Sequence, residues 1–150
     1  MTRPTIVCVP GPCLPAQIYE PLRDALAHHG YPVVPVSLPS IGSIPPPYDF
    51  AEDVIAIRSI IVELLEEQKD IIMLTQGFNG VSVCQALHGL GRIERESWGM
   101  RGGVMRLIFI SGWVVKEHFQ AAPRGDVSNM FSYMKVDPSV SENLQFDCDN

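Results

Sequence analysis

The sequence predicts an α/β fold in which a small parallel sheet of about four strands is flanked by helices, as a Rossmann-like three-layer sandwich. Two observations support this prediction. Short apolar runs of strand length alternate with longer segments whose apolar residues recur at helical spacing. Proline and glycine clusters separate these segments. Strands that alternate with helices run parallel, and ligands are then expected at their carboxyl ends.

The first strand and helix occupy the amino-terminal part of the chain. The β-branched run at residues 5–9 predicts a strand, which ends at Pro10-Gly11-Pro12 because proline cannot continue a central strand. From Pro15, apolar residues at helical spacing predict a helix, and Gly30 is a typical residue to follow its end.

The second strand is expected at residues 33–38. Pro35 interrupts it, which favours an edge position or a bulge. A proline-rich loop at 39–48 follows. Residues 49–67 then predict the longest helix, because apolar residues line one face of that segment.

The third strand is expected at residues 71–75, and a helix from about residue 80 to residue 90 follows a tight turn. A polar segment at 91–103 leads into the fourth strand at 107–110. Strand, tight turn and helix are the arrangement that carries the nucleophile in hydrolases with a nucleophile elbow.

Composition argues against several classes of function. A net charge of -6 without a basic cluster argues against nucleic acid or an anionic membrane as a partner. No apolar run approaches the roughly 20 residues of a membrane span, and no signal peptide is recognisable, so we expect a cytoplasmic protein. The four cysteines, at 8, 13, 84 and 148, lack metal-binding spacing, so we expect free thiols, no metal and no cofactor.

Several short motifs occur in order along the chain: Val9-Pro10-Gly11-Pro12, Ile18-Tyr19-Glu20-Pro21-Leu22, Gly30-Tyr31-Pro32-Val33, Val36-Ser37-Leu38-Pro39-Ser40 and Phe109-Ile110. In these motifs, over roughly residues 4–118, the chain resembles α/β-hydrolase-fold proteins common in fungi and bacteria. The resemblance implies that the four strands lie in the order two, one, three, four. It also implies a truncated domain, because the cap and the C-terminal half of that family would follow Asn150.

The turn after the third strand departs from the family's pattern. The family reads His-Ser-Tyr-Gly-Gly where this chain reads Gln76-Gly77-Phe78-Asn79-Gly80. Both the nucleophilic serine and the histidine before it are therefore replaced. In the family, the acid and the catalytic histidine come from the C-terminal half. The resemblance thus predicts that this chain does not hydrolyse substrates with a serine triad.

Other nucleophiles are weak candidates. Ser82 and Cys84 fall inside the helix rather than at the tip of the strand. Cys13 lies in the loop that helps to form the oxyanion hole in the family, but no histidine can be assigned beside it.

Oxyanion-hole chemistry remains possible at the turn. The backbone N–H of Phe78 and another from Gly11 or Cys13 are expected to converge on one oxygen, and Pro12 lies between these two loop residues without an N–H of its own. Gly77 leaves room where a serine side chain would stand. Such a site would hold and polarise a carbonyl without attacking it.

Four side chains complete the candidate site. Gln76 is the candidate catalytic residue beside the turn, and Asn79 either orients a ligand or satisfies local backbone groups. His118, just beyond the fourth strand, is the histidine we would test as an acid or base, and Trp113 precedes it at the rim. The remaining histidines, at 28, 29 and 88, are interpreted as helix-end residues.

Three classes of function remain open. The first is a non-hydrolytic enzyme, an isomerase, lyase or cyclase of pericyclase type, that acts on an apolar small molecule such as a secondary metabolite. The resemblance implies this class, since such enzymes occur among α/β-hydrolase-like proteins. The second is a non-catalytic pseudohydrolase that binds a ligand or partner, with Gly77 as a relaxed turn residue. The third is a residual hydrolase that needs a partner subunit.

The fourth strand would be a bare sheet edge in such a domain. We divide the chain into a core at 1–118 and a tail or lid at 119–150, with a short helix at about 127–135 and disordered last residues. An apolar edge at 105–110, guarded by Arg106 alone, favours association. We therefore expect a homodimer, formed through this edge or through the tail.

Overall fold

The computed structural model describes residues 3–45, 47, 49–112, 135–136 and 146–147. Along the chain the elements are β1 (Thr5–Val9), the 3-10 turn η1 (Ala16–Tyr19), α1 (Glu20–Ala27), β2 (Val33–Pro35), α2 (Ala51–Glu66), β3 (Asp70–Gln76), the 3-10 turn η2 (Gly77–Asn79), α3 (Gly80–Ala86), α4 (Arg92–Ser97), β4 (Gly103–Ile110), β5 (Lys135–Val136) and β6 (Phe146–Asp147).

The central sheet has the strand order β2-β1-β3-β4, and all its pairs are parallel. This confirms the order that the family resemblance implied. The carboxyl ends of β1 and β3 lie side by side, because Val9 is in register with Thr75. The loop after β1 and the turn after β3 therefore meet at one edge of the sheet. β5 and β6 form a separate antiparallel pair.

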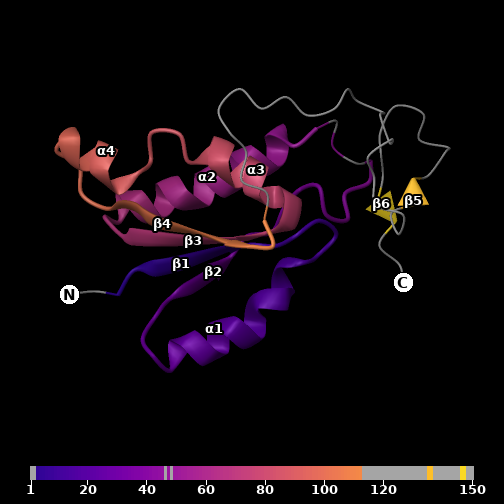
Figure 1. The fold of residues 1–150 in the computed structure, drawn as a ribbon, viewed down its shortest axis with the longest axis horizontal. Helices are drawn as coiled ribbons and strands as arrows, with labels where there is room; N and C mark the ends of the chain where they lie inside the picture. The colour runs from indigo at the N-terminus through magenta and orange to yellow at the C-terminus, as the bar shows by residue number, and fades with distance from the viewer. Residues whose placement is uncertain (1–2, 46, 48, 113–134, 137–145, 148–150) are drawn as a thin grey trace.

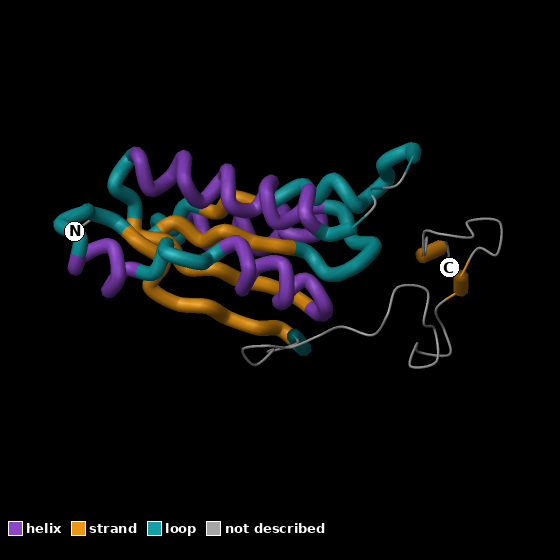
Figure 2. The backbone as a smooth tube through the Cα atoms, turned by 90° about the horizontal axis from the view of Figure 1, so that it is seen from above, coloured by secondary structure: helices purple, strands orange, loops and turns teal. Residues whose placement is uncertain are grey.

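Helices lie on both faces of this sheet, as three layers (Figures 1 and 2). α1 lies on one face, and α2 and α3 lie together on the other. The main core lies under α2 and α3. There Ile57 and Ile61 of α2 pack with Ile71 and Met73 of β3, and all four side chains are fully buried. By contrast, α1 has no buried residue.

Several boundaries differ from the sequence-based expectations. β2 ends at Pro35 rather than at residue 38, although the Val36 N–H still donates to the Cys8 carbonyl. α3 ends at Ala86, short of residue 90. β4 begins at Gly103, four residues earlier than expected. The helix expected at about 127–135 lies outside the described residues except for Lys135, which belongs to β5.

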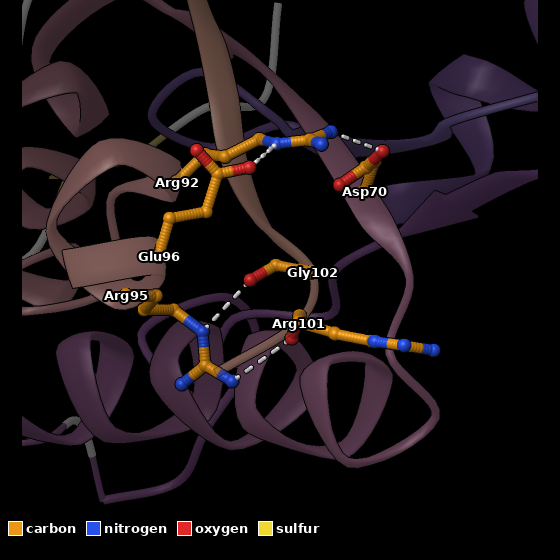
Figure 3. A network of polar contacts seen from close by, with 6 residues as sticks. All are labelled: Asp70, Arg92, Arg95, Glu96, Arg101 and Gly102. Carbon is orange, nitrogen blue, oxygen red and sulfur yellow. Dashed lines mark hydrogen bonds and ion pairs between the residues drawn. The ribbon is translucent and has the colours of Figure 1, made fainter. Parts of the chain in front are cut away.

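The polar segment before β4 contains a helix that the sequence analysis missed, α4. Figure 3 shows how this helix is held: Arg92 bonds to Asp70 at the start of β3 and, at 2.8 Å, to Glu96. Arg95 donates to the Gly102 carbonyl oxygen at 2.9 Å. A Cβ at Gly103 would lie 2.4 Å from the Arg92 Cα, so glycine is required there. This network lies at the amino ends of β3 and β4, opposite the candidate site.

Candidate functional site

The turn after β3 has the strand, tight turn and helix geometry of a nucleophile elbow. β3 ends at Gln76, η2 begins at Gly77, and α3 begins at Gly80. Gly77 has a φ of +60°, which glycine adopts without the cost that a Cβ imposes. A Cβ built there would lie 3.3 Å from the Pro12 Cδ. The position that carries the nucleophile in the family therefore faces the loop after β1 and presents no side chain.

Gln76 lies between the elbow and the loop after β1. A Cβ built at Gly11 would lie 3.4 Å from the Gln76 Cγ and 3.5 Å from its Cδ, so the side chain extends across the buried Gly11. The Gln76 side chain is half-buried, and its amide makes no hydrogen bond within the described part of the chain. A polar amide that is held in place by packing and has no partner among the described residues is suited to bind a ligand group.

Asn79 connects the elbow to the loop after β1. Its Nδ2 donates to the Pro10 carbonyl oxygen at 2.7 Å, and its side chain is only 2% exposed. Of the two roles considered for Asn79, this geometry favours the satisfaction of a backbone group. Asn79 therefore fixes the distance between the two segments that form the candidate site.

The cysteines correct one expectation. Cys13 is disulfide-bonded, so the prediction that all four cysteines are free thiols is wrong for this residue. Disulfide pairing depends on proximity in three dimensions, which spacing along the sequence does not reveal. A sulfur in a disulfide is not a thiolate, so Cys13 is no nucleophile in this state. It contributes to the candidate site through its backbone, in a turn with a φ of 63°.

The free thiols are poor nucleophiles as well. Burial raises the pKa of the Cys8 thiol to about 11, and it raises the pKa of Cys84. Burial first, and then the charge of Cys8, raises the pKa of Tyr19 to about 12, and the Tyr19 hydroxyl donates to the Val9 carbonyl oxygen at 3.3 Å. Ser82, 3% exposed inside α3, stands away from the tip of the strand as expected.

Asp53 is a positioning residue that the sequence analysis missed. It belongs to the first turn of α2 and is fully buried. Its Oδ1 accepts the Ser40 N–H at 2.9 Å, which holds the loop after β2 near the carboxyl ends of the strands. Its Oδ2 has no hydrogen-bond partner among the described residues, and the same is true of the buried Thr75 hydroxyl. Its position was a signal in the sequence, because Asp53 lies four residues before Ile57 in the buried row Asp53, Ile57, Ile61 and Leu65 of α2.

An aromatic pair joins α2 to the elbow. The rings of Phe50 and Phe78 lie 5.1 Å apart between centroids, at an interplanar angle of 47°. Phe50 directly precedes α2 and is 39% exposed, so it offers an apolar surface next to the turn. Trp113 and His118, the other two predicted site residues, lie outside the described residues.

Other features of the described residues lie away from the elbow or concern the whole chain. A hollow with a volume of about 410 Å³ follows the outer face of α2, lined by residues such as Ile55, Arg58 and Glu66. Within the described ranges, no three His, Cys, Asp or Glu side chains cluster closely enough to bind a metal ion. None of the described helices combines the length and apolarity needed to cross a membrane.

Comparisons with known proteins agree with this geometry. The model of the "Alpha/beta hydrolase family" matches residues 6–144. The "Alpha/beta hydrolase nvfD" of Aspergillus novofumigatus is 33% identical over 110 residues, which cover 73% of this chain and 43% of that protein. The "Probable hydrolase R7" of a Phoma species is 26% identical over 161 residues, covering 98% of this chain and 63% of that protein. The chain thus spans less than two thirds of the length of either relative.

Solved structures share the fold at low sequence identity. Polyneuridine aldehyde esterase superposes with a TM-score of 0.57 and 20% identity, over 73% of this chain and 40% of the esterase. Tomato Methylketone Synthase I in complex with 2-tridecanone superposes with a TM-score of 0.59 and 16% identity, over 81% of this chain and 44% of the synthase. These likenesses establish the same arrangement of strands and helices.

Proposed function

Because this chain belongs to the alpha/beta hydrolase family, we propose that its elbow serves an enzyme without a covalent nucleophile, which holds the carbonyl group of an apolar small molecule. The proposed reaction is an isomerisation, a lyase reaction or a cyclisation of pericyclic type, with a secondary metabolite as substrate. The supporting observation is the combination of an elbow geometry with Gly77 at the position of the nucleophile.

Gln76 is the proposed catalytic residue. Its amide is held against Gly11 and makes no hydrogen bond within the described residues, so an amide N–H is available to a substrate oxygen. The start of η2 and the loop after β1 lie at the same edge of the sheet as this amide. Donors fixed before the reaction stabilise charge on an oxygen more than mobile water does.

The absence of a side chain at Gly77 favours a reaction that needs shape and hydrogen bonding alone. A Cβ there would lie 3.3 Å from the Pro12 Cδ, so glycine lets the turn approach the loop after β1 closely and leaves no nucleophile at the elbow. The aromatic surface of Phe50 and Phe78 beside the turn suits an apolar substrate body. Methylketone Synthase I, a neighbour in fold, was crystallised with 2-tridecanone, whose long apolar chain and single carbonyl are of the ligand class proposed here.

A non-catalytic pseudohydrolase is the second candidate, and one observation favours it. A φ of +60° is the conformation in which glycine is the most relaxed residue, so Gly77 also fits an elbow that is kept for its shape alone. A ligand would then be bound at the turn without being converted. The two candidates differ in what they predict for the Gln76 side chain.

The test compares two glutamine variants on a compound that the protein converts. Such a compound is sought among those that accumulate in a strain lacking the gene. Gln76→Ala is expected to lower kcat on the order of 100-fold, the loss typical of one oxyanion donor. Gln85→Ala, at an exposed position on α3, is the matched control and should leave kcat unchanged. Equal kcat values for the two variants would show that the Gln76 side chain takes no part in the reaction.

A further inference from the structure

Two successive carbonyl groups at the end of β1 are held by side chains from other elements. The Tyr19 hydroxyl, from η1, donates to the Val9 carbonyl oxygen at 3.3 Å. The Asn79 amide, from η2, donates to the Pro10 carbonyl oxygen at 2.7 Å. Both donor side chains are buried. The peptide groups that lead from β1 into the loop are therefore fixed on both sides of Pro10.

Gly11 carries the one backbone donor at the start of this loop, because Pro10 and Pro12 on either side of it have no N–H. The Gly11 carbonyl oxygen accepts the Leu14 N–H at 3.2 Å, but the Gly11 N–H makes no hydrogen bond within the described part of the chain. Gly11 is buried, and a buried N–H without a partner is rare in folded proteins. This N–H therefore indicates a place where an oxygen atom from outside the protein binds.

The bond from Asn79 also sets the direction of this N–H. The peptide bond between Pro10 and Gly11 is trans, because the cis peptide bond among the described residues is the one between Ile44 and Pro45. In a planar trans peptide the C=O and the N–H point in opposite directions. By holding the Pro10 carbonyl, Asn79 therefore also holds the Gly11 N–H, with the proton directed away from Asn79.

We propose that the Gly11 N–H binds the carbonyl oxygen of the ligand, and that Asn79 is the residue that positions this donor. Gln76 supplies the second donor: a Cβ built at Gly11 would lie 3.4 Å from the Gln76 Cγ and 3.5 Å from its Cδ, so the amide lies beside the same residue. A carbonyl oxygen has two lone pairs and can accept from both groups. This inference rests on the proposed function, because it places the substrate carbonyl at the elbow.

An NMR titration of the isotope-labelled full chain with hexyl methyl ketone tests the donor. We expect the Gly11 amide proton to move downfield on binding, because a hydrogen bond to oxygen deshields the proton, and the side-chain amide protons of Gln76 to shift with it. A shift at Gln76 without a shift at Gly11 would overturn this inference and leave the proposed function standing. The absence of a shift at both residues would overturn the carbonyl site of the proposed function as well.

The same titration of Asn79→Ala tests the positioning role. Without its donor the Pro10 peptide can turn, so the ketone should bind about tenfold more weakly, with a smaller shift at Gly11. Asn79→Leu, which fills the same space without a donor, is the second variant and should behave alike. Ile71→Val, in the buried core of β3, is the matched control: it lowers stability but should leave the affinity and the Gly11 shift unchanged. Wild-type affinity and a wild-type Gly11 shift in either Asn79 variant would overturn the positioning role.

Discussion

Replacing Gly77 with serine restores the side chain that the elbow lacks and tests whether the turn now depends on glycine. The change has two costs in the structure. Gly77 has a φ of +60°, where a residue with a Cβ is strained, and the new Cβ would lie 3.3 Å from the Pro12 Cδ. Both effects oppose the serine, so we expect Gly77→Ser to lower the free energy of unfolding.

The conformational effect is the larger of the two. The left-handed region costs a residue with a Cβ roughly 1–2 kcal/mol. The contact with Pro12 requires a shift of a few tenths of an ångström and contributes less, because a proline ring at a loop can move by that amount. For a domain of this length, such a loss corresponds to a fall in Tm of about 2–8 °C.

Urea unfolding followed by circular dichroism, with two control variants, separates these effects. Gly30 has a φ of +76° and no heavy atom within 4 Å of its Cβ, so Gly30→Ser reports the conformational cost alone. Gly91 precedes α4 with a φ of -63° and has the same open space, so Gly91→Ser should not destabilise the protein. We expect Gly77→Ser to be slightly less stable than Gly30→Ser. A Gly77→Ser variant as stable as the wild type would refute this reasoning.

Two further predictions concern buried polar groups. Asn79→Ala leaves the buried Pro10 carbonyl without its 2.7 Å donor, so the free energy of unfolding should fall by about 1–3 kcal/mol in urea; an unchanged midpoint would show that this bond does not hold the loop. The pKa of Cys8 rises from its ordinary 9.0 to about 11 on folding, so its contribution to stability is complete below pH 9 and is lost as the pH rises toward 11. Unfolding measured across this range should therefore show a shallower decline in Cys8→Ala than in the wild type, and equal slopes would contradict the assignment.

The sequence predicted the elements whose residues carry a periodic apolar pattern. β1 and α2 were placed within a residue or two, because a β-branched run and a helix with one apolar face are visible locally. α4 was missed because it has no buried residue and is held by polar contacts such as the one between Arg92 and Glu96. A helix without an apolar face gives no hydrophobic periodicity to detect.

The candidate site, too, was predictable from the sequence only in part. The absence of a nucleophile at Gly77 was readable from the turn alone, because one position decides it. The bond between Asn79 and Pro10 joins residues 69 positions apart, and it depends on how β1 and β3 lie in the sheet. Asp53 lies in line with the apolar face of α2, but its bond to the Ser40 N–H depends on where the fold places the loop after β2. Tertiary contacts of this kind have no local signature in the sequence.

The mass of the product tests the central claim most directly. Small-molecule extracts of the parent organism and of a strain lacking the gene are compared by mass spectrometry, and purified protein is added to the compound that accumulates. An elbow without a nucleophile predicts either a product of equal mass, from an isomerisation or cyclisation, or two fragments whose masses add up to that of the substrate, from a lyase reaction. Products whose total mass exceeds that of the substrate by one water, together with labelling of the protein by an active-site-directed phosphonate, would identify a hydrolase and contradict the account.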